Sequence, residues 1–370
     1  MEISWRGVVA RRMERQFLAA QAGSAVEAVR GMCGAHAQIQ AAGEVSVALR
    51  VKEATRETVQ QDPGLVKTFG PRGTVHLLPL ADLPMWTGAL SALPGTSTQP
   101  VPIRMSPAEV EKVVAAVGEA LAHDDLTVDE LTEEVVARTG DWAREPTIPA
   151  FQGAWARWRQ AISVAANAGV LCYGPMRGRK TTYSNPHRLK PFQPMPAEKA
   201  LIELLDRYLH AYGPSTPQYF ARWLKTTPAV VKPYFADLPK GRLADQTVWY
   251  AAGDDDFAEK SIPELRLLPY FDAYGVGSYP RELLFPGKAF ARATARGQAG
   301  NYPLLLIDGI VAGVWHQRKT GRALHVTVEA LRPLNRRRRG LLEAEVDRLA
   351  AILGCVPSLT LGEVTVGAHA

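Results

Sequence analysis

Two glutamines, Gln38 and Gln40, flank Ile39 and are the side chains most worth testing for chemistry. An amide is neutral, so it is a poor general base and a poor metal ligand. On a helix, residues two apart lie on nearly opposite faces, whereas on an extended strand they share one face. We expect an extended segment in which both amides point the same way and Ile39 points into a core. Taken alone, so short a motif favours amides that only satisfy buried backbone groups.

Conventional catalytic signatures are absent from the sequence, which has no HExxH, no GxSxG, no P-loop and no dinucleotide fingerprint. The acidic run Asp254–Asp256 is expected to be a solvated turn rather than a metal site. His76 lies in a strand-like run and is expected to be structural. Trp155 and Trp158, three residues apart, are expected on the core face of a helix. We therefore expect neither a metal nor a cofactor.

The composition favours a globular protein that works in the cytoplasm. With 370 residues, of which 46% are hydrophobic, the chain can build two or three domains with substantial cores. No apolar stretch approaches the roughly 20 residues of a membrane helix, and the N-terminus lacks the apolar region of a signal peptide. The three cysteines are far apart and form no CxxC pair, which argues against disulfides and zinc.

Clustered arginines point to an anionic partner. Lys and Arg number 43 against 37 Asp and Glu, a net charge of +6. Guanidinium groups grip phosphate oxygens in a bidentate manner. Any one cluster is compatible with a solvated surface, but several together favour a charged polymer. The candidate phosphate contacts are Arg72, Arg177, Arg179, Lys180, Arg336, Arg337, Arg338 and Arg339.

A repeated order of elements predicts winged-helix units. In residues 106–185, one helix begins with a capping box of Ser106 and Glu109, and a second begins at Thr127. A helix over about 151–168, a strand over 170–173, a basic turn over 174–180 and a strand over 181–183 follow. The same outline returns in residues 196–252, with helices over 196–212, 218–224 and 227–235, a turn at 240–242 and a strand over 247–250. It is less clear near the N-terminus, with helices over 6–21 and 24–33 and a strand–turn–strand over 66–78.

Short β runs dominate from residue 265 onward, with hairpin turns expected at Asp308-Gly309 and Thr320-Gly321. A helix over about 338–353 and a strand over 359–366 follow. The predicted fold class is α+β, with three tandem winged-helix units and a C-terminal β-rich domain. The expected segments are 1–100, which carries the glutamines, then 101–192, 193–260 and 261–370.

Three motifs in register resemble the AlkZ/AlkX family of DNA glycosylases: Gln38-Ile39-Gln40, residues 70–79 (GPRGTVHLLP), and residues 267–272 (LLPYFD) with Arg281. The resemblance extends over essentially the whole chain. It implies tandem winged-helix units around a C-shaped DNA-binding channel. It also implies excision of purines alkylated at N7, including the two ends of interstrand crosslinks, and self-resistance to DNA-alkylating natural products. The family's two glutamines correspond to Gln38 and Gln40; AlkX-like relatives have aspartate at the second position, so this chain resembles the AlkZ side.

The implied chemistry suits neutral amides. N7 alkylation makes the purine a cation and hence a good leaving group, so the enzyme must chiefly place a water beneath C1′. Two amides can hold a water by donating and accepting hydrogen bonds. So weak a catalyst would spare unmodified nucleotides.

The expected partner is double-stranded DNA bearing N7-alkylguanine or a crosslink, bound by a monomer. A crosslinked base cannot be flipped without dragging the opposite strand, so we expect an open channel and a base still near the stack. Two alternatives stand beside this interpretation. One is a non-catalytic winged-helix transcriptional regulator, and the other is a protein-docking scaffold. Release of a damaged base discriminates the glycosylase from both.

Overall fold

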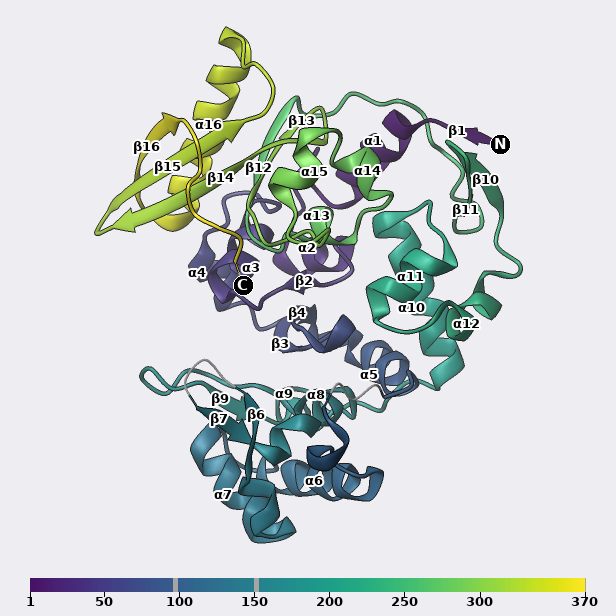
Figure 1. Cartoon of the computed structure of the whole chain (residues 1–370), viewed down its shortest axis with the longest axis vertical. Coiled ribbons are helices and arrows are strands. Elements are labelled where there is room, and N and C mark those ends of the chain that lie inside the picture. Colours follow the sequence, from purple (N-terminus) through teal and green to yellow (C-terminus); the bar gives the residue numbers. More distant parts are fainter. Residues whose placement is uncertain (96–98, 150–152, 370) are drawn as a thin grey trace. The chain divides into compact units, whose positions relative to one another are not determined.

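The computed structural model describes residues 1–95, 99–149 and 153–369. The chain forms two compact units: residues 1–65 with 205–370, and residues 66–204 (Figure 1). Both units mix helices with short strands, which confirms the α+β class. No helix in the described part of the chain is long and apolar enough to cross a membrane.

The larger unit joins N-terminal helices to a C-terminal sheet. Before residue 65 its elements are β1 (Glu2–Ile3), α1 (Trp5–Arg15), α2 (Ala25–Gly31), β2 (Ala35–His36), α3 (Gln40–Ala48) and α4 (Arg56–Gln60). After residue 205 they are the end of α10 (Ala197–Tyr212), α11 (Pro217–Leu224), α12 (Pro228–Val231), β10 (Lys240–Leu243), β11 (Gln246–Trp249), β12 (Leu265–Leu268), α13 (Ala273–Gly277), α14 (Arg281–Leu284), α15 (Lys288–Ala293), β13 (Leu304–Ile307), β14 (Ile310–Thr320), β15 (Ala323–Ala330), α16 (Arg336–Leu353) and β16 (Val356–Leu361).

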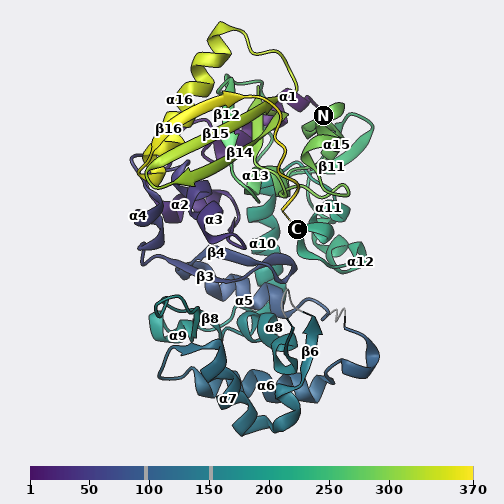
Figure 2. The same cartoon turned by 60° about the vertical axis from the view of Figure 1, so that its left-hand side comes forward.

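A five-stranded sheet has the strand order β12-β13-β14-β15-β16, and its strands β14, β15 and β16 lie side by side in Figure 2. Neighbouring strands of this sheet are antiparallel except β15 and β16. These two are parallel, so the chain must cross back between them, which it does through α16. The turn predicted at Asp308-Gly309 is confirmed; both residues have positive φ, 52° and 71°, as a tight two-residue hairpin turn requires. The second turn comes one residue later than predicted, at Gly321-Arg322.

The core of this unit unites the two ends of the sequence. Val9 and Met13 of α1 pack in one buried cluster with Leu304 of β13 and with Val311 and Val314 of β14. Helix α1 and the sheet therefore exclude water from these apolar side chains by packing against each other. This core therefore joins residues near position 10 to residues beyond position 300.

A smaller sheet has the order β1-β10-β11. The predicted turn at 240–242 is wrong: these residues belong to β10, which pairs antiparallel with β11 and parallel with β1. The chain instead turns at Ala244, whose φ is 50°. An alanine in the left-handed region gives no sequence signal for a turn, whereas the glycine at 241 gave a misleading one.

The smaller unit contains β3 (Leu65–Phe69), which begins at its boundary, β4 (Val75–Pro79), α5 (Leu83–Ser91), α6 (Pro107–Ala120), β5 (Leu126–Thr127), α7 (Val128–Thr139), β6 (Pro146–Pro149), β7 (Ala154–Ala156), α8 (Ile162–Asn167), β8 (Cys172–Tyr173), β9 (Thr182–Ser184) and α9 (Pro186–Leu189), followed by the start of α10. The sheet β5-β9-β8 is antiparallel, and the predicted basic turn connects β8 to β9. The predicted capping box of Ser106 with Glu109 is present, and the predicted helix start at Thr127 is confirmed; the structure shows that Thr127 also forms a capping box with Glu130.

The predicted long helix over 151–168 is wrong in its first half. Residues 150–152 lie outside the described residues; the chain then forms β7, a 3-10 turn over Arg157–Ala161, and only afterwards α8. Trp158 is fully buried in the core, as predicted, but Trp155 is 47% exposed and stacks under Arg159, whose Cζ lies 4.1 Å from the ring centroid. The helical spacing argument fails for Trp155 because this residue lies on a strand.

Candidate active site

Gln38, Ile39 and Gln40 lie where the chain turns from β2 into α3. Gln38 is exposed in a bend, Ile39 is the half-buried N-cap with φ −98° and ψ 100°, and Gln40 is the first residue of the helix. The expected extended segment with Ile39 directed into a core is therefore wrong. Gln38 thus precedes the helix and Gln40 begins it, so the two amides do not extend from one face of a strand.

Helix α3 lies deep in the larger unit. Every residue from Ala42 to Ala48 is buried, as in a helix surrounded by protein on all sides. Gly43 permits the close approach of the first turn to β2, because a Cβ at this position would lie 2.5 Å from the carbonyl oxygen of His36. The N-cap residue makes no side-chain hydrogen bond to the helix, so the ordinary start signal is missing.

A buried carboxylate lies one turn along the helix from Gln40. Gln40 Nε2 donates to Glu44 Oε1 at 2.8 Å, and Glu44 Oε2 accepts from Arg56 Nε of α4. Glu44 is only 1% exposed. The amide of Gln40 is thereby connected through Glu44 to the guanidinium group of Arg56.

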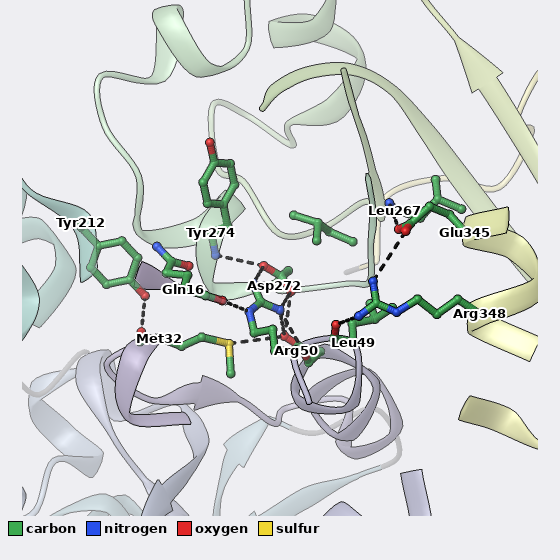
Figure 3. A network of polar contacts seen from close by, with 12 residues as sticks. Gln16, Met32, Leu49, Arg50, Tyr212, Leu267, Asp272, Tyr274, Glu345 and Arg348 are labelled. Atoms are coloured by element: carbon green, nitrogen blue, oxygen red, sulfur yellow. Dashed lines mark hydrogen bonds and ion pairs between the residues drawn. The ribbon is translucent and has the colours of Figure 1, made fainter. Parts of the chain in front are cut away.

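An ion pair shielded from solvent holds the other end of α3 (Figure 3). Arg50 donates from Nη1 to Asp272 Oδ2 and from Nη2 to Asp272 Oδ1, each at 2.8 Å, and both side chains are 0% exposed. Arg50 Nε also donates to the carbonyl oxygen of Gln16 at 2.8 Å, and Ser46 Oγ donates to Asp272 Oδ2 at 2.7 Å. Asp272 caps α13 by accepting from the backbone N–H of Tyr274 at 3.0 Å.

Helix α16 adds a second attachment, also visible in Figure 3. Arg348 donates to the carbonyl oxygen of Leu49, directly after α3. Glu345, one turn earlier, accepts from the backbone N–H of Leu267 at 3.1 Å and from Arg266 Nη1 at 3.2 Å. The end of α3 is thus bound to the N-cap of α13 and to α16, and Glu345 binds α16 in turn to β12.

These contacts give the LLPYFD motif a structural role. Leu267 and Leu268 are buried in β12, and Asp272 is the partner of Arg50. Arg281, which accompanies this motif in the resemblance, donates to the carbonyl oxygen of Ser278 at 2.8 Å and to those of Gly275 and Val276. It thereby satisfies carbonyl groups at the end of α13. Burial lowers the pKa of Arg281 from its ordinary value.

Glu44 and Arg50 were missed by the sequence reasoning. The available signal was a charged residue at each end of an almost wholly apolar run, VSVAL, because charges at such positions are rarely buried without a partner. The partners themselves lie as far as 222 residues away, so spacing could not reveal them.

The basic turn between β8 and β9 is partly engaged in ion pairs. Arg177 Nη1 contacts Glu130 Oε1 at 2.8 Å, and Lys180 Nζ contacts Asp129 Oδ2 at 3.0 Å, both carboxylates belonging to the first turn of α7. Arg179 is exposed and makes no polar contact within the described parts of the chain. Of the three, Arg179 is therefore the most available cation.

Charge reversal in this turn is expected to weaken DNA binding. The double variant Arg179→Glu/Lys180→Glu should bind duplex DNA less tightly and lower the slope of log affinity against log salt by about 1 for each phosphate that it no longer neutralises. The control is Arg138→Glu/Arg144→Glu, the same change of charge at two exposed, ion-paired arginines of the same unit. Equal affinities for the two variants across a salt titration would remove Arg179 and Lys180 from the interface.

The other arginine candidates are distributed between the two units. Arg337 and Arg338, in the first turn of α16, contact Glu264 at 3.1 Å and 2.8 Å, while Arg336 and Arg339 are exposed without an ion pair among the described residues. Four arginines at the positive end of a helix dipole are unfavourable in isolation, which Glu264 offsets. Arg72 is half-buried, with φ 63°, in the turn between β3 and β4.

The expected structural role of His76 agrees with its surroundings, whereas the expected solvation of Asp254 does not. His76 is buried and its Nδ1 lies 2.8 Å from the carbonyl oxygen of Thr74. Burial, with a smaller effect of Arg72, lowers the pKa of His76 to about 3, so its ring is neutral at ordinary pH. Asp254, expected in a solvated turn, is instead paired with Arg11 and Arg15, and its side chain is only 18% exposed. Among the described residues no group of three or more His, Cys, Asp or Glu side chains is arranged to hold a metal.

Comparison with known proteins assigns the family. A family model described as DNA glycosylase AlkZ-like matches residues 29–352. This chain belongs to the AlkZ-like DNA glycosylases. A Streptomyces sahachiroi protein, the interstrand DNA cross-link repair glycosylase, is 32% identical over 336 residues, which cover 85% of this chain and 88% of that protein. The solved structure of Streptomyces sahachiroi DNA glycosylase AlkZ superposes with a TM-score of 0.83 at 28% identity, over 98% of this chain and 100% of that one.

Membership confirms the resemblance to AlkZ and makes the chain an enzyme, a hydrolase of N-glycosyl bonds in DNA. The interpretation as a non-catalytic regulator is therefore wrong. The order of helices and strands alone could not distinguish an enzyme from a regulator, because a fold does not determine a function.

Proposed function

We propose that this AlkZ-like glycosylase removes purines alkylated at N7, including those in interstrand crosslinks, using a water positioned by Gln38 and Gln40. The proposal is supported by the glutamine pair at the start of α3 in a chain of this family. The name of the Streptomyces relative assigns crosslink repair to that protein, and its similarity over 85% of this chain supports the same class of lesion here.

The proposed step is a hydrolysis without a covalent enzyme intermediate. The bond between C1′ and N9 breaks, and its electron pair goes to the base, which cancels the positive charge created by N7 alkylation. The water oxygen bonds to C1′ and its proton passes to solvent. The amides of Gln38 and Gln40 need only hold the water in line, through donated and accepted hydrogen bonds.

Selection of the substrate follows from the weak catalysis that two neutral amides provide. Unmodified purines leave poorly without protonation, and a pair of neutral amides supplies no strong acid. A cationic N7-alkylpurine leaves readily, so it reacts while normal DNA does not. We propose that this selectivity serves self-resistance to a DNA-alkylating natural product.

For the DNA-bound state we propose a monomer whose tandem winged-helix units form a channel for double-stranded DNA, with the damaged base remaining near the stack. The proposed segments are 1–100, 101–192, 193–260 and 261–370. The proposed phosphate contacts are Arg72, Arg177, Arg179, Lys180, Arg336, Arg337, Arg338 and Arg339, of which Arg179, Arg336 and Arg339 are exposed without an ion pair among the described residues.

An abasic-site assay tests the proposed function. The wild-type enzyme is incubated with a duplex that carries one N7-methylguanine and, separately, with a duplex crosslinked through N7. After alkali or heat we expect strand cleavage at the methylated position and release of the two strands from the crosslink. The control is the same damaged duplex treated identically without enzyme, because N7-methylguanine also leaves on heating. Cleavage no greater than in this control would refute the proposal.

A further inference from the structure

We propose that Glu44 is a positioning residue that fixes the orientation of the Gln40 amide toward the water it holds. This inference rests on the proposed function and deepens it. It adds to the two glutamines a third residue that contacts neither the water nor the DNA but determines which atom of Gln40 is presented to them.

The geometry places Glu44 in the right position for this role. It lies four residues after Gln40, on the same side of α3, and its Oε1 is 2.8 Å from Gln40 Nε2. An ionised carboxylate only accepts hydrogen bonds, whereas an amide has both a donor and an acceptor end. The Nε2 end of Gln40 must therefore face Glu44, and Oε1 must lie on the opposite side of the amide group.

Fixing the amide in this way has a catalytic consequence. An Oε1 presented to the water accepts one of its O–H bonds, which turns a lone pair of the water oxygen toward C1′. A flipped amide would present N–H instead and would draw that lone pair away from C1′. An amide free to flip would spend part of its time in this unproductive orientation.

Glu44 is itself held in place. Its side chain is 2% exposed, and its second oxygen accepts from Arg56 Nε, a residue whose own side chain is 42% exposed. The two carboxylate oxygens are thus engaged by Gln40 and Arg56. This arrangement suits a group that orients its neighbour better than a general base, which needs an oxygen directed at the water.

The test is a double-mutant cycle read by single-turnover base release. Glu44→Gln keeps the shape of the side chain, but its amide can also donate, so it no longer dictates the orientation of Gln40. We expect the rate constant to fall by about 10-fold to 100-fold, with unchanged affinity for lesion-containing DNA. In a Gln40→Ala background the same substitution should have no further effect, because Glu44 then has no amide to orient.

Glu329→Gln is the matched control for Glu44→Gln. Glu329 is also a poorly exposed glutamate paired with an arginine, Arg292, at 2.7 Å in the same unit, but it is not connected to Gln40. Its substitution should leave the rate unchanged. If Glu44→Gln does not fold, Arg56→Ala is the alternative variant, because it removes the hydrogen bond to Glu44 Oε2 and lets the carboxylate move. It should give a smaller loss of rate, again only when Gln40 is present.

Three results would overturn the positioning role. They are a Glu44→Gln enzyme with the wild-type rate, an equal loss in the Gln40 and Gln40→Ala backgrounds, and a loss of DNA affinity that accounts for the whole effect. Failure of the proposed function itself is distinguishable, because the wild-type enzyme would then release no N7-methylguanine.

Discussion

Replacing both Gln38 and Gln40 by alanine is expected to lower the single-turnover rate of N7-methylguanine release by about 100-fold or more. Without the two amides, no group at the start of α3 holds the attacking water in line with C1′. Affinity for the same DNA should change little, because neither residue is charged and phosphate contacts dominate binding. Quench-flow or manual time courses at saturating enzyme measure the rate, and a titration at equilibrium measures the affinity.

Gln61→Ala serves as the control for this experiment. Gln61 is an exposed glutamine that also bonds a glutamate four residues away, Glu57 Oε1 at 3.3 Å, but it lies at the end of α4 and not in the motif. It should retain the wild-type rate. A fully active Gln38→Ala/Gln40→Ala enzyme would disprove the water-positioning role, and the amides would then be structural.

Asp272→Asn is expected to destabilise the larger unit by about 3–5 kcal/mol, because it leaves the guanidinium group of Arg50 buried without a counterion. The asparagine retains an oxygen that can cap α13, so the change isolates the loss of charge. Urea denaturation followed by tryptophan fluorescence measures the free energy of unfolding. Activity should fall with the folded fraction, since α3 is held by this pair.

Asp308→Asn is the matched substitution at a surface ion pair. Asp308 contacts Arg338 Nη2 at 3.1 Å with 57% of its side chain exposed, and asparagine tolerates its positive φ. This variant should lose less than about 1 kcal/mol. Removing both charges in Arg50→Met/Asp272→Leu should recover part of the stability lost in Asp272→Asn. If Asp272→Asn costs no more than Asp308→Asn, the Arg50 pair does not anchor α3.

Local signals predicted much of the fold. The capping box at Ser106, the helix start at Thr127 and the turn at Asp308-Gly309 depend on residues three apart or fewer, and all three predictions are confirmed. The helix predicted over 196–212 is also confirmed as α10, in which Leu201, Leu204 and Leu205 are buried. In each case the information lies within one or two turns of the chain.

The candidate site was harder to predict because its decisive contacts are not local. The start of α3 has an apolar N-cap, Ile39, so nothing in the sequence distinguished a helix start from a strand. The pairing of Arg50 with Asp272 joins segments 222 residues apart. The resemblance to a family pointed to Gln38 and Gln40, but only the structure places Glu44 beside Gln40.

The shared core of α1 and the C-terminal sheet has a consequence for how the enzyme is made. On the ribosome, the segment bearing Gln38 and Gln40 emerges early, but Asp272 and Arg348, whose contacts hold the end of α3, emerge about 10–60 s later at roughly 5–20 residues per second. Until then α1 has no sheet to cover, so a chaperone or the nascent chain itself must shield its apolar face. A DNA glycosylase of this fold thus acquires its completed site only after residues 272 and 348, far along the chain, have been synthesised.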